Sequence, residues 1–297
     1  MRVLAVGHCT LDQIGFVEHF ARDDEKVEMP TFSVQGGGTA ATAAVALARW
    51  GATASFVGKV GDDDRGDQIV RTLKEEGVET AQMVRDAGKI SQVRFAIVEV
   101  KSGHRQTYYT PGNVGPLLRE DVDAGLVEGH DLLLVDGMFP QVKIKLMERA
   151  NELGIPVVLE ADHDRHVVGD CVTHADVVVA SEREASAFTG VGSLEGICAA
   201  FLEQGPKIAI VTLGDEGAVA MGRGQELVRI EATDVDVIDT MGAADVFLGA
   251  VGLGILKDWG LEKMVRFASA AAGVACTGPG GRSAIIELET LEAQLEL

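Results

Sequence analysis

Short runs of apolar residues alternate with helical patterns along most of this chain. The first run, at residues 3–6, comes before an Ala-rich segment at 39–50, and a second run at 55–60 comes before a helical pattern at 64–76. Later runs are dominated by Val, Leu, Ile and Ala, and they lie at 131–135, 156–159, 175–179 and 207–211. Strands that are covered on both faces require such continuous apolar runs. The alternation therefore predicts βα units, an α/β fold and a mostly parallel central sheet.

Two regions, at about 14–35 and 90–110, interrupt this rhythm. In both regions apolar and polar residues alternate without an intervening helix, which is typical of antiparallel strands. We expect these regions to form a small separate sheet. Alternatively, they extend one edge of the main sheet.

The composition fits one globular domain that spans residues 1–297 and carries the small sheet as an appendage. Of the 297 residues, 46% are hydrophobic and 24% are charged, and no low-complexity tract indicates a linker. The formal net charge of −20 opposes binding to nucleic acid or to an anionic membrane, so we expect neither as a partner. A nucleotide can still bind, because local N–H groups and Mg²⁺ act at contact distance.

The cysteines lie far apart in the sequence and form no C-x-x-C pair: Cys9, Cys171, Cys198 and Cys276. We therefore expect reduced and mostly buried thiols, without a disulfide framework or a thiolate zinc site. Residues 1–7 are too few for the apolar core of a signal peptide, and no apolar stretch reaches about twenty residues. These features predict a cytoplasmic protein. The histidine cluster at 162–166 is more simply interpreted as a polar loop than as a divalent-ion site.

The most informative stretch is the heptad at 239–245, which reads Asp-Thr-Met-Gly-Ala-Ala-Asp and comes before an apolar helical pattern. Residues 235–238 alternate like the end of a strand, so we expect Gly242, Ala243 and Ala244 at a helix N-terminus. Unpaired N–H groups and the positive end of the helix dipole gather there, and they suit a phosphate. Asp245, in the first helical turn, is placed to accept a proton from a substrate hydroxyl. An ordinary loop-to-helix start is the alternative.

This heptad resembles the second signature of the PfkB, or ribokinase-like, family of carbohydrate kinases, D-T-x-G-A-G-D. Six of its seven positions agree, and Ala244 stands where the family usually has Gly. Further resemblances follow in order along almost the whole chain. They imply a three-layer α/β/α fold whose small antiparallel sheet is a lid over the sugar site and often a homodimer contact. The implied reaction is ATP-dependent phosphorylation of a sugar hydroxyl. In it Asp245 is the catalytic base, and the N–H groups of residues 242–245 stabilise the developing charge.

On the sugar side, a Gly-Gly turn before a helix of small residues resembles the first family signature. The resemblance implies substrate contacts by Gly37, Gly38 and Thr42, the last at a position where the family usually has Asn. Without the resemblance, this turn reads as a packing device. Asp12 follows the first strand, at the edge where open α/β sheets bind ligands, and suits two sugar hydroxyls; alternatively it is a turn residue. Lys26, in the implied lid, is either a contact for an anionic substrate group or a surface charge.

On the nucleotide side, Ser181 and Glu184 resemble the family's N-x-x-E element, which arranges Mg²⁺ and phosphate through water. Ser181 replaces the usual Asn, and a helix capping box is the alternative interpretation of this pair. Thr212, Gly214 and Gly217 fit the family's ATP-binding segment, V-T-x-G-x-x-G-A. The resemblance therefore implies ATP and Mg²⁺ as cofactors.

Small residues at 271–284 resemble the family's helix beside the adenine and the glycine loop that follows it. In relatives, that loop and the first Asp of the heptad can hold a monovalent cation such as K⁺. Asp239 and Gly280 are therefore candidate cation ligands. A helix C-cap followed by Pro is the simpler account of Gly278 and Pro279.

Within the family, the motifs look closest to the sulfofructose kinase branch, with fructokinases and ribokinases next. The departures at Thr42, Ser181 and Ala244 keep a second class open, a sugar- or nucleotide-binding protein that has lost catalysis. A nucleoside kinase is the nearest enzymatic alternative, and the scarcity of aromatic residues for stacking disfavours it. A dinucleotide-dependent dehydrogenase is disfavoured because the first strand is not followed by G-x-G-x-x-G.

Overall fold

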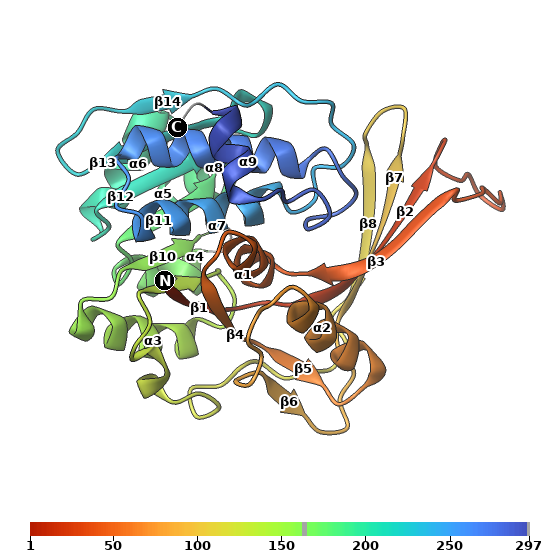
Figure 1. The fold of residues 1–297 in the computed structure, drawn as a ribbon, viewed down its shortest axis with the longest axis horizontal. Coiled ribbons are helices and arrows are strands. Elements are labelled where there is room, and N and C mark those ends of the chain that lie inside the picture. The colour runs from red at the N-terminus through yellow and green to blue at the C-terminus, as the bar shows by residue number, and fades with distance from the viewer. Residues whose placement is uncertain (162–164, 296–297) are drawn as a thin grey trace.

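The computed structural model describes residues 1–161 and 165–295, and an eight-stranded sheet forms its centre (Figure 1). In spatial order its strands are β4 (Thr53–Val57), β1 (Arg2–Val6), β9 (Leu132–Val135), β10 (Val157–Glu160), β11 (Val177–Ser181), β12 (Ile208–Thr212), β13 (Ala218–Gly222) and β14 (Val228–Ile230). The first six are parallel neighbours, and β13 and β14 pair antiparallel at one edge. The predicted mostly parallel sheet is confirmed.

Helices cover both faces of this sheet, which gives three layers (Figure 1). One face carries α1 (Thr39–Arg49), α7 (Ala243–Leu256) and α8 (Leu261–Ala275), with α9 (Leu288–Gln294) against α8. The other carries α3 (Pro140–Leu153), α4 (Arg165–Val172), α5 (Glu182–Thr189), α6 (Leu194–Glu203) and the short 3₁₀ helix η1 (Ala124–Val127). Strand side chains alternate between the two resulting cores, so Val3 and Ala5 pack on one side and Leu4 and Val6 on the other.

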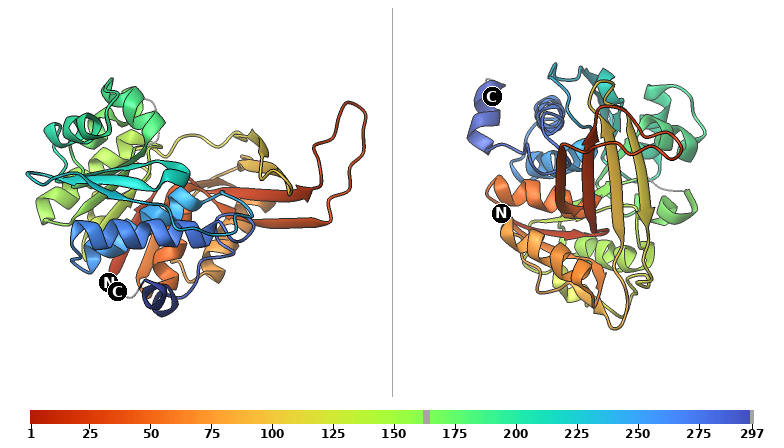
Figure 2. Two further views of the ribbon diagram at one scale, coloured as in Figure 1. Left: turned by 90° about the horizontal axis from the view of Figure 1, so that it is seen from above. Right: turned by 90° about the vertical axis from the view of Figure 1, so that its right-hand side faces the viewer.

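A second, four-stranded sheet projects from one side of the body (Figures 1 and 2). In spatial order its strands are β3 (Thr31–Gly37), β2 (Thr10–Val17), β7 (Val93–Glu99) and β8 (Arg105–Thr110). The β3–β2 and β7–β8 pairings are antiparallel, whereas β2 and β7 are parallel because the chain passes through the body between them. This small sheet is separate from the main one, so the edge-extension alternative is wrong, and it begins at Thr10, before residue 14.

The two faces of the small sheet differ in burial. Side chains on the body-facing side, Ile14, Phe16, Ala96 and Val98, form one buried cluster with Met241 of the loop before α7. The opposite face, here called the outer face, carries large apolar side chains that are 40–60% exposed: Phe32, Val34, Phe95 and Tyr108. Because successive strand residues point to opposite faces, the cross-strand register places these four in neighbouring rows. The small sheet therefore covers the loop before α7 with one face and presents the other to solvent.

A two-stranded sheet lies beside α2 (Asp64–Glu75), which confirms the helix predicted at 64–76. Its strands are β5 (Lys59–Gly61) and β6 (Val84–Asp86), and they pair in parallel. Gly58 separates β4 from β5, so the apolar run predicted as one strand at 55–60 is divided between two sheets.

Residues 235–238 do not form the predicted end of a strand, and this prediction was wrong. The N–H groups of Ile238 and Asp239 instead donate to the carbonyl oxygen of Cys276, at 2.8 and 3.2 Å, where α8 ends. The carbonyl oxygen at the end of α8 thus accepts hydrogen bonds that a carbonyl oxygen of a neighbouring strand would otherwise accept. The predicted helix start is nevertheless in place, because α7 begins at Ala243.

All four cysteines are buried free thiols, as expected. Burial raises the pKa of Cys9 to about 12 and the pKa of Cys171 and of Cys198 to about 11, so these thiols are poor nucleophiles. No single helix within residues 1–161 and 165–295 is long and apolar enough to cross a membrane, and one bent pair, α5 with α6, meets the same length and composition limits together. The histidine cluster at 162–166 falls largely on residues 162–164, outside the described part of the chain.

Candidate active site

The start of α7 is open to ligands. Gly242 is the N-cap residue with φ 76°, and no side chain caps this end of the helix. A Cβ atom at position 242 would lie 2.2 Å from the Cα atom of Gly281, so only glycine fits both the backbone conformation and the space. Ala244 is exposed, and Asp245 follows in the first turn. The predicted set of residues 242–245 therefore lies together at an accessible helix N-terminus, where anions are favoured.

Asp245 is half-buried among charged residues from distant parts of the chain. Burial raises the pKa of its carboxyl, while the charges of Arg94 and Arg282 and a hydrogen bond from the Thr39 side chain act in the opposite direction. Asp12 adds a smaller upward effect on this pKa. A carboxylate with a raised pKa is a stronger base once it is deprotonated, which suits proton removal from an alcohol.

Asp12 lies within β2 and is not a turn residue after β1. It is 2% exposed, and it forms an ion pair with Arg94 of β7 in which the Arg94 Nε atom donates to Oδ1 at 3.1 Å and Nη2 donates to Oδ2. A Cβ atom at Gly37 would lie 2.1 Å from the Asp12 carboxylate. Gly37 is thus needed so that the carboxylate fits against the glycine turn, and the structure brings these two predicted substrate residues together.

Thr42 lies beneath the same turn and is 1% exposed. Its hydroxyl accepts a hydrogen bond from Nε of Arg282 at 3.4 Å, and Nη2 of Arg282 donates to the carbonyl oxygen of Gly37, also at 3.4 Å. Burial lowers the pKa of this arginine to about 10. The Thr42 hydroxyl, which the family resemblance assigns to substrate, therefore already binds the Arg282 side chain. Gly38 adopts φ 99° at the N-cap of α1 and keeps its predicted place beside Gly37.

A cavity of about 630 Å³ adjoins the start of α7. Predicted nucleotide residues line one side of it, from the β12–β13 turn with its 3₁₀ helix η2 (Gly214–Glu216): Thr212, Gly214 and Gly217. Small residues of α7 and α8 line the other side: Ala243, Ala244, Ser269, Ala272 and Gly273. The cavity is thus lined both by the predicted nucleotide residues and by the first residues of α7, as a nucleotide with its phosphates requires.

Ser181 and Glu184 do not line this cavity. Ser181 ends β11, in register with Thr212, and its hydroxyl caps α5 by accepting the N–H of Glu184 at 3.4 Å. The Glu184 carboxylate accepts a hydrogen bond from Arg183 at 2.6 Å. The helix-cap interpretation of Ser181 is therefore confirmed. The Glu184 carboxylate lies in the first turn of α5, directly after β11, on the side of the sheet where Thr212 lines the cavity. This position still fits a water-mediated contact with Mg²⁺.

Asp239 and Gly280 meet behind the start of α7. Asp239 is 3% exposed, and its Oδ1 and Oδ2 atoms accept the N–H groups of Met241 and Gly280, both at 3.0 Å. The guanidinium of Arg105, from β8 of the small sheet, lies 3.4 Å from Oδ1. Gly280 thus contributes a donor to this carboxylate.

Lys26 is not brought to the site. It is exposed in the loop 18–30, which projects beyond the ends of β2 and β3 (Figure 2). From Asp12 to the end of β2 the strand alone spans about 17 Å. This structure therefore supports a surface charge at position 26.

Three residues near the site were missed by sequence reasoning: Thr39, Arg105 and the side chain of Arg282. Each acts across more than 100 residues of sequence, on Asp245, Asp239 and Thr42 respectively. The position of Thr39, directly after the Gly-Gly turn, was a signal that a helix N-terminus lies there. Nothing in the local pattern around Arg105 indicated its partner.

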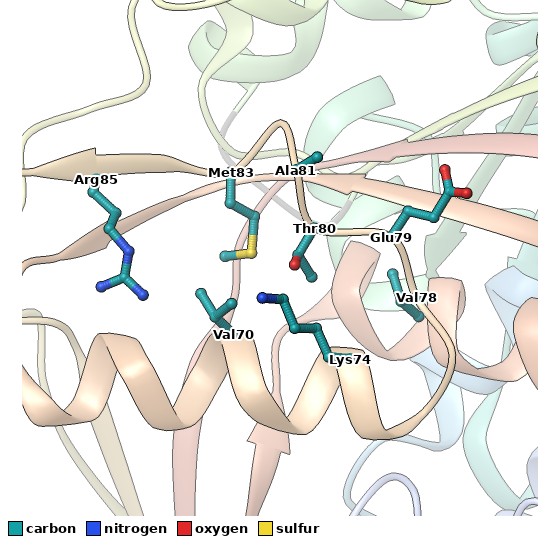
Figure 3. Close-up of a pocket in the computed structure, with 8 residues that line it drawn as sticks. All are labelled: Val70, Lys74, Val78, Glu79, Thr80, Ala81, Met83 and Arg85. Carbon is teal, nitrogen blue, oxygen red and sulfur yellow. The ribbon is translucent and has the colours of Figure 1, made fainter.

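Another hollow, of about 690 Å³, lies on the outside of the molecule between α2 and the segment that leads into β6 (Figure 3). Its lining comes from these two segments: Val70, Lys74, Val78, Glu79, Thr80, Ala81, Met83 and Arg85. No residue of the predicted site takes part. Although this hollow is larger than the cavity beside α7, it is therefore not the candidate active site.

The pfkB family carbohydrate kinase model matches residues 1–288. The chain belongs to this family. The kinase is 26% identical to a ribokinase of Haemophilus influenzae over 97% of its own length and 96% of that protein. It also superimposes on a proposed ribokinase from Agrobacterium tumefaciens with a TM-score of 0.93 and 26% identity, over 99% and 97% of the two chains. The resemblance that the motifs indicated is confirmed, and the kinase is a carbohydrate kinase.

Similar structures were solved with nucleotide. A proposed ribokinase II from Escherichia coli in complex with ATP and Mg²⁺ has a TM-score of 0.87 to this kinase, at 18% identity over 99% of both chains. This likeness shows a shared fold.

Proposed function

We propose that this kinase transfers the γ-phosphoryl group of ATP to a hydroxyl of a small carbohydrate, with Asp245 as the base. The observation that carries the proposal is the position of Asp245. It lies at the start of α7, which lines the proposed nucleotide cavity, and it is near enough to the ion pair of Asp12 with Arg94 for both charges to act on it. An alcohol held beside Asp12 would lose its proton to Asp245 as it attacks phosphorus.

The same helix start stabilises charge. The N–H group of Ala243 donates to the carbonyl oxygen of Thr240 at 3.4 Å, and those of Gly242, Ala244 and Asp245 would stabilise the transferred phosphoryl group without rearrangement during the reaction. Bound Mg²⁺ would neutralise part of the charge on the phosphate oxygens, with Glu184 holding it through water. Thr212, Gly214 and Gly217 would hold the nucleoside part.

On the substrate side, Asp12 and the turn at Gly37 and Gly38 would hold sugar hydroxyls, and the small sheet would exclude water. The Asp12 carboxylate is already shared with Arg94, and Thr42 with Arg282. Both guanidinium groups therefore border the sugar site. We expect a ketose, a ribose-like sugar or a sulfosugar, since all three present hydroxyls to a carboxylate.

We further propose a homodimer formed through the outer face of the small sheet. Four large apolar side chains are exposed there side by side, on a sheet that projects from the body (Figure 2). Contiguous exposed apolar surface of this kind marks interaction sites. A kinase that consumes ATP as donor also belongs where ATP is made, and we propose a cytoplasmic location on that ground.

The reaction is tested by an assay of ADP formation over ketoses, aldoses, sugar phosphates, sulfosugars and nucleosides. In the best substrate, Asp245→Asn should lower turnover by about 10² or more, because the amide cannot accept the proton. ATP binding, measured by calorimetry, should remain within about threefold of the wild type, a change below about 1 kcal/mol.

Asp236→Asn is the matched control, because Asp236 is exposed nearby and does not line the cavity. Near-normal turnover by Asp245→Asn would contradict the assignment of the base. Sugar binding without any ADP release would indicate a binding protein that has lost catalysis.

A further inference from the structure

The buried carboxylate of Asp239 requires a positive partner. It is 3% exposed, and it lies behind the phosphate-facing start of α7, where its two N–H donors come from Met241 and Gly280. The family resemblance implies a monovalent cation at this place. An ion such as K⁺ is held by oxygen atoms, so the acceptors around Asp239 decide whether one fits.

The loop 276–286 adjoins Asp239, and two of its carbonyl oxygens already accept hydrogen bonds from protein donors. The Cys276 oxygen accepts the N–H groups of Ile238 and Asp239. The Pro279 oxygen accepts Nε2 of Gln35 at 3.0 Å and the hydroxyl of Ser283 at 2.7 Å.

Three further carbonyl oxygens of the loop are taken by α1 and the residue that follows it. Arg49 donates through Nη1 to the oxygens of Arg282 and Ile285, at 2.8 and 2.9 Å. The indole N–H of Trp50 donates to the Ile286 oxygen at 3.1 Å. Five carbonyl oxygens of the loop 276–286 thus already accept hydrogen bonds from protein donors, so this loop offers few free oxygens to a monovalent cation.

Arg105 brings the missing charge from another element. It is the first residue of β8, its side chain is 34% exposed, and its Nη1 atom lies 3.4 Å from Oδ1 of Asp239. In the sheet register Arg105 pairs with Val98, whose side chain belongs to the body-facing cluster. The guanidinium therefore reaches Asp239 from the covered face of the small sheet, between that sheet and α7.

We propose that Arg105 supplies the positive charge that a monovalent cation would otherwise place at Asp239, so that the kinase binds nucleotide without K⁺ or Na⁺. The inference rests on the proposed nucleotide site. Neutralising Asp239 removes a negative charge from behind the helix start, where phosphate oxygens gather. Because Arg105 belongs to the small sheet, it delivers this charge only while that sheet lies against the body. Arg105 is thus a positioning residue, acting through Asp239 and the Gly280 loop.

Calorimetric titration with ATP, in KCl and in tetramethylammonium chloride of equal ionic strength, tests this proposal. The wild type should bind ATP with the same affinity in both salts, within about twofold. Arg105→Ala should bind ATP about tenfold or more weakly in both salts, since a buried carboxylate is left without its partner. Arg105→Lys should keep most of the affinity.

Chemical rescue separates a charge role from a merely structural one. A low, non-denaturing concentration of guanidinium chloride should restore ATP affinity to Arg105→Ala, and K⁺ should not. Gln106→Ala is the matched control, because the next residue of β8 points to the opposite face of the sheet and its side chain contacts Tyr108. This variant should behave as the wild type. Melting temperatures in the two salts provide a second readout that needs no ligand.

Each contrary result has its own meaning. Wild-type ATP affinity or melting temperature that rises strongly with K⁺ would overturn the proposal and restore the cation. Arg105→Ala with unchanged affinity, or rescued equally well by K⁺, would overturn the role of Arg105. Failure of every variant to bind ATP in any salt would overturn the nucleotide site itself, and this inference with it.

Discussion

At the scale of single residues, the neighbours of the Asp245 carboxylate determine its pKa. Asp245 has a raised pKa because it is buried, and Arg94 and Thr39 limit that rise. Asp245 is on α7, and its two partners come from β7 and from the first residue of α1. The base is therefore tuned by elements that only the folded chain brings together.

Thr39→Val should move the acid side of the pH–rate profile to higher pH. Removing the hydroxyl removes a hydrogen bond to the carboxylate, so the pKa of Asp245 rises further. A base works only when deprotonated; kcat/KM therefore falls as the pH drops through this pKa, and in the variant the fall begins at higher pH. Rates over pH are the measurement. Thr39→Ser, which keeps the hydroxyl, should retain the wild-type profile, and an unshifted profile for Thr39→Val would exclude this role.

At the scale of elements, the start of α7 depends on two glycines in contact, Gly242 and Gly281. Sequence reasoning found this helix start because small residues before an apolar helix are a local signal. The same holds for α1, α2 and the parallel strands, whose patterns repeat within a few residues. It did not find the contact of Arg105 with Asp239, since those residues lie 134 positions apart and meet only when the small sheet folds over the body. It also extended a strand into 235–238, where the end of α8 supplies the hydrogen bonds instead.

Gly242→Ala should lower the free energy of unfolding by about 3 kcal/mol and weaken ATP binding. The substitution adds both left-handed strain and a Cβ atom that meets Gly281 at 2.2 Å. Gly224→Ala is the matched control, because Gly224 has φ 74° and open space around its Cβ position, and it should lose only about 1 kcal/mol. Urea unfolding of both variants gives the comparison. Equal losses would show that the contact with Gly281 does not matter.

At the scale of the whole molecule, the kinase combines a rigid three-layer body with a projecting sheet whose outer face is apolar (Figure 1). The formal charge of −20 makes two copies repel each other, so a dimer has to be held by apolar contact. Salt screens that repulsion, and we expect dimerisation to strengthen as ionic strength rises.

Light scattering after gel filtration should give the wild type a mass of twice 31.3 kDa. The double variant Phe32→Lys and Phe95→Lys should be a monomer, because it places charges on the outer face. Leu153→Lys is the control, since Leu153 is a 42% exposed apolar residue at the end of α3, away from the small sheet. A wild-type monomer at all salt concentrations would rule out this dimer.

The small sheet is tied to the body through two guanidinium groups, Arg94 on Asp12 and Arg105 on Asp239. Both carboxylates are almost fully covered, so swinging the sheet outward would strip each of its counter-ion in one movement. Departure of a phosphorylated sugar then has to wait for that double rupture. The slow step of each catalytic cycle would consequently be the opening of the small sheet. Added salt would speed this step, because it weakens the two ion pairs.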